Sequence, residues 1–404
     1  MRDVHKRRAA ILLWSIVGAL LFLVVVKFFV ADVYRVDSGS MRPTLFGGPG
    51  ASGDEGLYER VLVAYDRSPH LARFDPVVLR SPDGGKPIVK RVVGLPGETI
   101  SITEGDLLIE GRRLPPDAPR PAPIVLFDDE VLDVSGFFQF EEELWTRTDQ
   151  SWVLDATGVG AGEDRGMMKF HKELLDGYID HRARRVPGLE QVNDGILECE
   201  VRMDHPGPGA MLRFELLEEG DTFKAQLVSV PPEGFLLRLL RVNGETLQRT
   251  GPGPYYDVLF EEEIPFRTGI WRHVEFANVD NTLSFELDDV RVMTVSYAAN
   301  VPYPRRTGTA NKSIGPRVGF GAEGCQAAFR SILVLRDLYY TERGEYAVSS
   351  LLSLGPGEFF LAGDNSADSR DSRDFGPVQA SEILGRPIAV VWPPDRMRRI
   401  KGAE

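Results

Sequence analysis

Two segments of the sequence carry residue types that could perform acyl transfer together. Ser38 and Ser40 lie in a Ser-Gly-Ser-Met stretch, and Lys90 lies among the apolar residues of 88–93. A serine hydroxyl is a weak nucleophile and needs a nearby base; histidine is the usual base, but neither segment contains one. Lys90 can serve only if it is neutral, and burial among apolar neighbours lowers a lysine pKa from its ordinary ~10.4. Without further context, a solvated strand lysine is the simpler interpretation of Lys90.

That context comes from four segments that resemble the sequence boxes of bacterial type I signal peptidases, in the expected order. The resemblance covers roughly residues 8–125 and 345–395. It implies a serine endopeptidase in which Ser40 attacks the scissile carbonyl and Lys90 moves the protons. It also implies that the Ser40 N–H and the Ser38 hydroxyl stabilise the oxyanion, whereas the alternative for Ser38 is an ordinary turn residue. The four segments are 38–45, 73–78, 90–98 and 363–378.

The last of these segments supplies the supporting residues that the resemblance implies. Ser369 aligns with the serine that hydrogen-bonds the catalytic lysine and orients it. Asp371 and Arg373 would form an ion pair that holds the loop, and Asp364 would support the site from the same segment.

The same segment departs from the usual pattern of the family. The Arg-Asp pair that commonly follows Gly-Asp-Asn is missing, and Asp-Ser-Arg occurs twice, at 368–370 and 371–373. The repeat allows an error of three positions in the alignment. Ser366 or Ser372 could therefore be the partner of Lys90 in place of Ser369.

The N-terminal part contains an apolar stretch, 11–31, that is long enough to cross a ~30 Å hydrocarbon core as a helix. A cleaved secretory signal is the alternative, but no Ala-x-Ala site follows. The positive-inside rule keeps the preceding basic residues in the cytoplasm. We therefore expect a single-pass protein of the bacterial inner membrane with a cytoplasmic N-terminus, contact with membrane lipid, and a periplasmic portion from about Asp32 onward. The basic residues are Arg2, Lys6, Arg7 and Arg8.

Composition narrows the classes of protein. The net charge of -13 argues against a nucleic-acid binder. The six histidines show no pair at ligand spacing and no Cys-x-x-Cys occurs, so neither a metal nor another cofactor is expected. Cys199 and Cys325 could form a disulfide outside the membrane, or remain two buried free thiols.

The predicted fold is mainly β in three parts. A cytoplasmic N-terminus and transmembrane helix (1–31) precede a split, β-barrel-like catalytic domain (32–126 and 342–404), which an inserted β-sandwich interrupts (127–341). In the catalytic domain we expect a hairpin around Gly105-Asp106. Its predicted strands are 60–65, 76–80, 88–93, 99–102, 107–109, 358–362 and 389–392.

The insert resembles concanavalin-like jelly rolls in two stretches, 269–287 and 315–334. This resemblance is carried by strand, turn and aromatic core patterns, so Trp271 is predicted as a core residue rather than a platform for a sugar. A glycan or protein ligand of the insert is one hypothesis, and a spacer role is the other.

Together these features predict a type I signal peptidase that cleaves signal peptides from exported preproteins after small residues. Only about eight residues separate Ala31 from Ser40, so at up to ~3.5 Å per residue the nucleophile stays close to the membrane, where such substrates are inserted. One alternative is a membrane-anchored, lectin-like binding protein on an inactive protease frame, which the presence of both dyad residues disfavours. A self-cleaving protein of the repressor type is disfavoured by the apolar N-terminal stretch.

Overall fold

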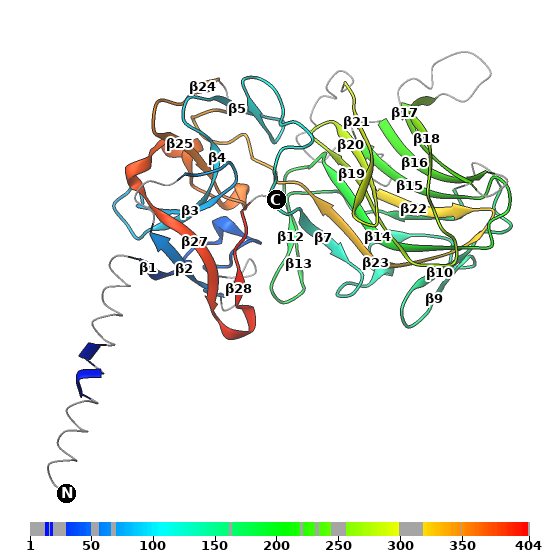
Figure 1. Ribbon diagram of the computed structural model, residues 1–404, viewed down its shortest axis with the longest axis horizontal. Coiled ribbons are helices and arrows are strands. Elements are labelled where there is room, and N and C mark those ends of the chain that lie inside the picture. Colours follow the sequence, from blue (N-terminus) through cyan, green and yellow to red (C-terminus); the bar gives the residue numbers. More distant parts are fainter. Residues whose placement is uncertain are drawn as a thin grey trace, which may run out of the picture. The chain divides into compact units, whose positions relative to one another are not determined.

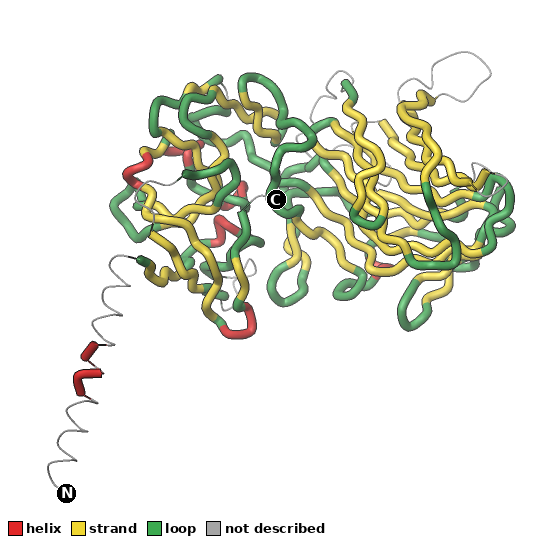
Figure 2. The backbone as a smooth tube through the Cα atoms, viewed as in Figure 1, coloured by secondary structure: helices red, strands yellow, loops and turns green. Residues whose placement is uncertain are grey.

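The computed structural model describes most of the chain as two compact units. Unit 1 comprises Met1–Ala122 and Tyr339–Glu404, and unit 2 comprises Pro123–Leu338. Strands and loops account for nearly all of the described chain, and helices are short (Figures 1 and 2), so the predicted mainly-β class is confirmed. The described residues are 13–15, 17–18, 30–49, 56–65, 70–160, 164–218, 221–230, 234–243, 256–298, 318–348 and 350–402.

Among these described residues, no helix is both long and apolar enough to cross a membrane. Most of the transmembrane helix predicted at 11–31 lies outside the described part of the chain.

Unit 1 is built on an antiparallel sheet of order β1-β2-β27-β3-β4-β25-β26, with β28 added beside β27. The strand β27, which follows the insert in sequence, lies between β2 and β3, which precede it. The two halves of unit 1 therefore share one sheet. The strands are β1 (Ala31–Arg35), β2 (Arg60–Tyr65), β3 (Pro76–Leu79), β4 (Ile88–Gly94), β25 (Glu358–Ala362), β26 (Val378–Gln379), β27 (Ile383–Trp392) and β28 (Arg398–Arg399).

A second, three-stranded sheet of unit 1 has the order β24-β5-β6, from Leu352–Ser353, Thr99–Thr103 and Asp106–Ile109. The hairpin predicted around Gly105-Asp106 is present, but its turn is one residue earlier. Thr103 pairs with Asp106, and Glu104 and Gly105 have φ of 59° and 92°. Positive φ suits glycine, and a two-residue loop needs it at both positions, which fixes the turn at 104–105.

The helical segments are single turns, and one of them carries the predicted nucleophile. In that turn Met41 is buried, packing with Val36 and Leu45 against Val61 and Val89 of the sheet. The burial of these apolar side chains anchors the turn on the sheet. The segments are η1 (Gly39–Met41), η2 (Val134–Gly136), η4 (Ser366–Asp368), α2 (Ser372–Phe375), η5 (Ala380–Glu382) and η6 (Pro394–Arg396).

Unit 2 contains two larger sheets, and the alternating side chains of both contribute to one apolar core. The first has the order β21-β20-β19-β14-β23-β10-β9, with β7 beside β23. Its strands are β7 (Ile124–Asp128), β9 (Trp145–Arg147), β10 (Trp152–Asp155), β14 (Gly195–Asp204), β19 (Arg272–Val279), β20 (Thr282–Leu287), β21 (Val290–Ser296) and β23 (Gln326–Arg336).

The second sheet of unit 2 has the order β18-β17-β16-β15-β22-β11-β8, and β12 and β13 form a separate ribbon. The strands are β8 (Phe138–Gln139), β11 (Met167–Phe170), β12 (Tyr178–Ile179), β13 (Arg185–Val186), β15 (Met211–Glu218), β16 (Asp221–Val230), β17 (Gly234–Asn243), β18 (Tyr256–Ile264) and β22 (Val318–Glu323).

Two predictions about single residues of unit 2 can be compared with the structure. Cys199 and Cys325 are buried free thiols, so the second of the two alternatives holds. Trp271 is not a core residue as predicted: its half-buried ring lies beside the guanidinium groups of Arg330 and Arg202, at 4.2 and 5.2 Å from the ring centroid. Cation–π contacts of this kind hold an aromatic ring at the surface of a sheet.

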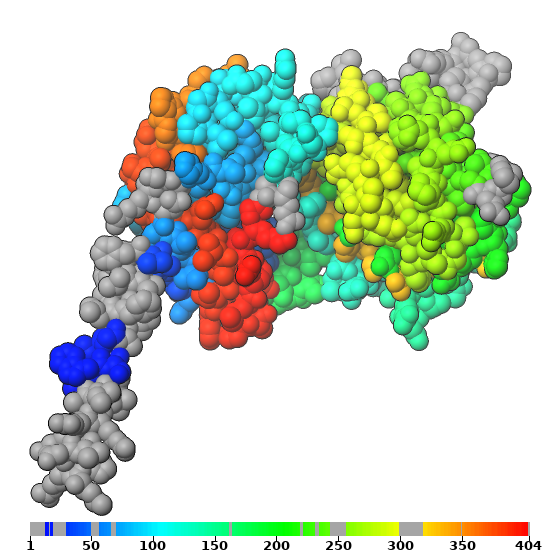
Figure 3. Space-filling view, in the orientation of Figure 1, coloured from blue at the N-terminus to red at the C-terminus, as the bar shows by residue number. Residues whose placement is uncertain are grey.

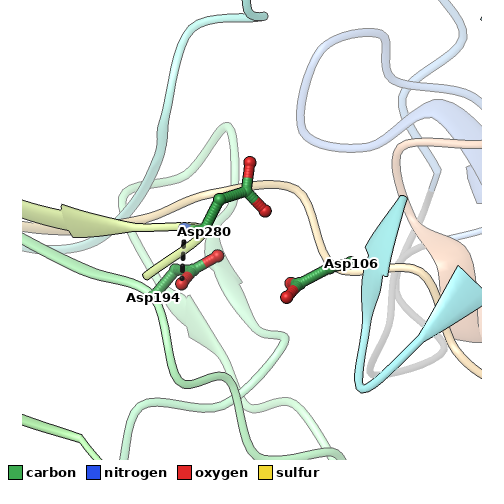
Figure 4. A group of neighbouring side chains, drawn as sticks. All are labelled: Asp106, Asp194 and Asp280. Atoms are coloured by element: carbon green, nitrogen blue, oxygen red, sulfur yellow. Dashed lines mark hydrogen bonds between the residues drawn. The ribbon is translucent and has the colours of Figure 1, made fainter. Parts of the chain in front are cut away.

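The Asp280-Asn281 turn predicted between two strands joins β19 to β20. Both residues have positive φ, 51° and 59°, as a two-residue hairpin loop requires. The Asp280 N–H donates to Asp194 Oδ1 at 3.2 Å, the contact drawn as a dashed line in Figure 4. This bond fixes the turn on the segment that leads into β14. Asp106, also labelled there, belongs to β6 of unit 1.

The two ends of unit 2 are neighbours in one sheet. Ile124, at the start of β7, pairs with Arg336, at the end of β23. Antiparallel partners have Cα atoms about 4.5–5.5 Å apart. The chain therefore leaves unit 2 almost where it entered it, as an insertion into another unit requires.

Candidate functional site

The turn η1 presents Ser40 at the edge of the apolar core of unit 1, and Ser40 is only 4% exposed. A Cβ on Gly39 would lie 2.9 Å from Asp368 Oδ2 and 3.1 Å from Arg42 Cζ, so the ends of these two side chains pack closely against the glycine. The backbone N–H of Asn365 donates to Ser40 O at 3.0 Å, and its side-chain amide donates to Gly39 O at 3.1 Å. The turn is therefore held from the loop that follows β25.

The structure brings Ser40, Lys90 and Ser38 together. Lys90, in the buried strand β4, donates from Nζ to Ser40 Oγ at 2.5 Å. The Ser38 Oγ lies 3.2 Å from Ser40 Oγ, and Ser38 itself has an extended backbone just before η1. A nucleophile within hydrogen-bond reach of a base is the geometry that serine acylation needs.

The environment of Lys90 favours its neutral form. The residue is 2% exposed, and this burial lowers its pKa to about 8. The carboxylates of Asp371 and Asp364 act in the opposite direction, and the Arg373 charge acts with burial. A lysine with a pKa near 8 carries a substantial neutral fraction in mildly alkaline solution, so it can accept a proton.

Ser369 lies next to Gly363, beside the pair formed by Ser40 and Lys90. A Cβ on Gly363 would lie 2.3 Å from Ser369 Oγ and 2.5 Å from Ser40 O, so both serines lie close against this glycine. The Ser369 hydroxyl donates to Asp371 Oδ2 at 2.6 Å. Since its hydroxyl proton goes to Asp371, direct orientation of Lys90 by Ser369 stays a prediction.

The other two candidate serines of this loop are engaged elsewhere. Ser366 Oγ accepts from Arg373 Nη1 at 2.6 Å and from the Thr341 N–H at 2.7 Å. Ser372 Oγ accepts from the Leu361 N–H at 3.0 Å. The hydroxyls of Ser366 and Ser372 thus serve the loop and strand backbone.

Asp371 and Arg373 form the buried ion pair on which this loop is assembled. Arg373 Nη2 lies 2.8 Å from Asp371 Oδ2, and the two residues are 1% and 0% exposed. The remaining donors of Arg373 reach Thr341 and Ser366, so the guanidinium is saturated. Burial would raise the pKa of Asp371, but the hydrogen bonds and charge of Arg373 hold it below its ordinary value.

Asp364 supports the site through a partner that the sequence did not identify. Arg91 donates from Nε and Nη2 to the two carboxylate oxygens of Asp364 at 2.7 and 2.6 Å, and both residues are almost fully buried. The Thr44 hydroxyl also donates to Asp364 Oδ2, at 2.6 Å. Asp364 therefore connects the residue after Lys90 to the segment after Ser40. The one signal for these contacts in the sequence was that Arg91 and Thr44 lie inside two of the segments that resemble the signal peptidase boxes.

The chain resembles known proteins, and the match to a family model covers the segments that build this site. The family model for signal peptidase, peptidase S26, matches residues 9–131 and 336–392. Signal peptidase I P of Bacillus subtilis subsp. natto is 34% identical over 116 residues, 28% of this chain and 58% of that protein. Signal peptidase I of Streptococcus pneumoniae serotype 4 is 36% identical over 101 residues, 24% of this chain and 43% of that protein. The chain thus spans about half the length of these curated relatives.

Among solved structures, the carbohydrate binding module CBM66 from Bacillus subtilis aligns with a TM-score of 0.29 at 12% identity, over 47% of this chain and 90% of that one. A TM-score this low does not establish a shared fold, so the jelly-roll resemblance of the insert rests on its sequence.

The sequence resemblance to signal peptidases is confirmed by the family model and by the relatives, and the family model covers the segments that supply Ser40 and Lys90. Over residues 9–131 and 336–392, this chain is thus similar to the signal peptidase family, peptidase S26.

Proposed function

We propose that the chain is a type I signal peptidase, an endopeptidase that removes signal peptides from exported preproteins by a Ser–Lys mechanism. The observation that carries the proposal is the 2.5 Å hydrogen bond from Lys90 Nζ to Ser40 Oγ in a buried site. Its support is the location of this pair in the segments that match the family.

In the first half of the reaction, Ser40 Oγ attacks the scissile carbonyl carbon while neutral Lys90 accepts the hydroxyl proton. The oxyanion would be stabilised by the Ser40 N–H and the Ser38 hydroxyl, which lies 3.2 Å from the attacking oxygen. Lys90 then gives its proton to the leaving amine, and the N-terminal part of the substrate stays esterified to Ser40.

In the second half, Lys90 takes a proton from water, the hydroxide equivalent attacks the ester carbonyl, and the proton returns to Ser40 Oγ. Burial of the base suits both halves, because a lysine exposed to water would stay protonated even in mildly alkaline solution.

The substrate and location follow from the resemblance and the apolar N-terminal stretch. We propose that 11–31 anchors the chain in the bacterial inner membrane, with the N-terminus cytoplasmic and the catalytic unit periplasmic. Exported preproteins would then present their cleavage sites, which follow small residues, close to Ser40.

The test is cleavage of a preprotein by the detergent-solubilised chain, with Ser40→Ala and Lys90→Met as the inactive variants. Lys86→Met is the matched control, because Lys86 lies four residues before Lys90 but is exposed and pairs with Asp37 at 3.0 Å. The wild type and the Lys86 variant should release the mature protein, and the two dyad variants should not. Cleavage that survives either dyad substitution would overturn the mechanism, and an intact preprotein with the wild type would overturn the function.

A further inference from the structure

Both ends of the loop that carries Ser40 are hydrogen-bonded to one residue, Glu59. We call residues 36–46 the nucleophile loop. The Val36 N–H donates to Glu59 O at 2.9 Å, and the Glu59 N–H donates to Phe46 O at 2.9 Å. The Phe46 N–H returns a bond to Glu59 Oε2, also at 2.9 Å. One residue therefore holds both ends of the loop that contains Ser38 and Ser40.

The carboxylate of Glu59 is 0% exposed, which is costly for a charge unless it is paired. Its partners are two arginines at the far end of the chain. Arg398 donates to Oε1 and Oε2 at 2.7 and 3.1 Å, and Arg396 donates to Oε1 at 2.7 Å. Burial alone would raise the pKa of Glu59, but Arg398, the Phe46 N–H and Arg396 hold it below its ordinary value.

Both arginines also contact the nucleophile loop itself. Arg398 Nη2 donates to Thr44 O at 2.7 Å, and the Arg396 guanidinium lies 4.7 Å from the centroid of the Phe46 ring. In Figure 3 the red C-terminal surface of unit 1 lies directly beside blue residues from the first part of the chain. The segment that contains Arg396 and Arg398 is thus part of the support of the loop.

A short chain of contacts leads from Glu59 to the dyad. Phe46 follows Leu45, whose N–H donates to Met41 O at 2.8 Å, and Met41 follows Ser40 in the turn η1. A shift of the loop at Phe46 would therefore reach Ser40 within one turn of chain. Reactions of positioned groups are sensitive to such shifts, and about 1 Å of misplacement can cost on the order of 100-fold in rate.

We propose that Glu59, with Arg398 and Arg396, forms a positioning cluster that sets Ser40 against Lys90. The proposal rests on the proposed function for its kinetic consequence. None of the three residues contacts the dyad in the described hydrogen bonds, so the cluster acts through the nucleophile loop. The side chain of Arg399, the neighbour of Arg398, is exposed and makes no hydrogen bond or ion pair among the described residues, so Arg399 offers a matched control.

The kinetic test compares Arg398→Met and Glu59→Gln with Arg399→Met in the full chain, well below the unfolding midpoint of each variant. Arg398→Met should lower kcat for preprotein cleavage by at least about tenfold with KM within about threefold, because the loop shifts while substrate contacts remain. Glu59→Gln keeps the backbone bonds and an acceptor for the Phe46 N–H, so it should lose less. Arg399→Met should match the wild type.

A second kinetic readout separates positioning from stability alone. If Ser40 moves away from Lys90, water reaches the amine, and the acid limb of the pH–rate profile should move to higher pH in Arg398→Met. An unchanged limb and an unchanged kcat in both cluster variants would overturn the proposal.

Hydrogen exchange separates this proposal from the function on which it rests. Peptides covering 36–46 should exchange faster in Arg398→Met than in Arg399→Met, and this measurement needs no substrate. Equal exchange would overturn the cluster even in an active enzyme. Faster exchange in a protein that cleaves no preprotein would support the cluster and overturn the function.

Discussion

Lys90 is almost fully buried, and the proposed role of Lys90 as a base depends on that burial. An exposed lysine is almost entirely protonated at neutral pH, whereas this one has a pKa of about 8. The nearby Asp371 and Asp364 limit the shift, so the amine remains basic enough to take a proton from a serine hydroxyl.

Cleavage should therefore depend on pH through Lys90. Below a pH of about 8 the lysine is protonated, so kcat/KM should fall roughly tenfold per pH unit on the acid side and level off above it. The measurement is preprotein cleavage across this range, with Ser40→Ala as the background. A flat profile from mildly alkaline to acid solution would contradict a neutral lysine base.

Ser38 offers a second test at this scale. If its hydroxyl donates to the oxyanion, Ser38→Ala should lower kcat by about 100- to 1,000-fold with little change in KM. Single-turnover kinetics measure this directly, and the exposed Ser381→Ala is the control. A change in kcat of less than about threefold would show that Ser38 is an ordinary turn residue and does not stabilise the oxyanion.

The sequence was a better guide to the proposed dyad than to the residues that support it. Ser40 and Lys90 lie in recognisable boxes, and Asp371 and Arg373 are only two positions apart. Glu59 pairs with Arg398 across 339 positions and Arg91 with Asp364 across 273, which no local pattern reveals. Such pairs depend on how the sheet brings distant segments together.

At the scale of the element, the loop from Gly363 to Gly376 is organised around one buried guanidinium. Two arginines of this loop make ion pairs, and they differ in exposure. The side chain of Arg373 is 2% exposed beside Asp371, whereas that of Arg370 is 65% exposed beside Asp83.

The two pairs should contribute very differently to stability. Arg373→Met leaves the Asp371 carboxylate buried without its partner and should lower the free energy of unfolding by about 3–5 kcal/mol. Arg370→Met should change it by less than about 1 kcal/mol. Denaturant unfolding of both variants measures the contrast, and equal losses would show that the loop does not depend on the buried pair.

A row of three glutamates crosses three strands of unit 2. Glu198 pairs with Glu275, which pairs with Glu286 on the next strand. Like charges directly opposite each other are unfavourable. Burial, with Glu286 and Glu198 adding to it, raises the pKa of Glu275 to about 7.

This row should make unit 2 less stable as the pH rises. Glu275 must lose its proton in the folded state above about pH 7, whereas the unfolded chain loses it near 4.5. The penalty grows between these values, so Glu275→Gln should stabilise the protein by about 1–3 kcal/mol at pH 8 and by little at pH 4.5. Thermal unfolding at the two pH values is the measurement, and an equal gain at both would contradict it.

Strand positions were predictable where side chains alternate or where an apolar run is bounded by turns. β2 and β25 have the expected ends, 60–65 and 358–362, for this reason. The two-residue strands β24, β26 and β28 have no period to detect. The order of the sheet, with β27 between β2 and β3, also depends on long-range pairing.

At the scale of the whole molecule, the adjacent ends of unit 2 make a specific deletion possible. Replacing residues 123–338 with a linker of about four to six Gly and Ser residues should close unit 1 without strain, because Ile124 and Arg336 are paired. The shortened chain should fold and retain kcat/KM on a short peptide within about fivefold. Circular dichroism and peptide cleavage test this; a chain that fails to fold would show that unit 1 depends on unit 2.

The pairing of Glu59 with Arg398 also imposes an order in time on a newly made chain. The ribosome adds about 5–20 residues per second, so the 339 positions between them take about 17–70 s to synthesise. During that interval the serine segment already exists, but the arginines that close its loop do not. If the cluster positions Ser40, a nascent chain that already contains Ser40 cannot hold its nucleophile loop in the positioned arrangement until Arg396 and Arg398 have been added.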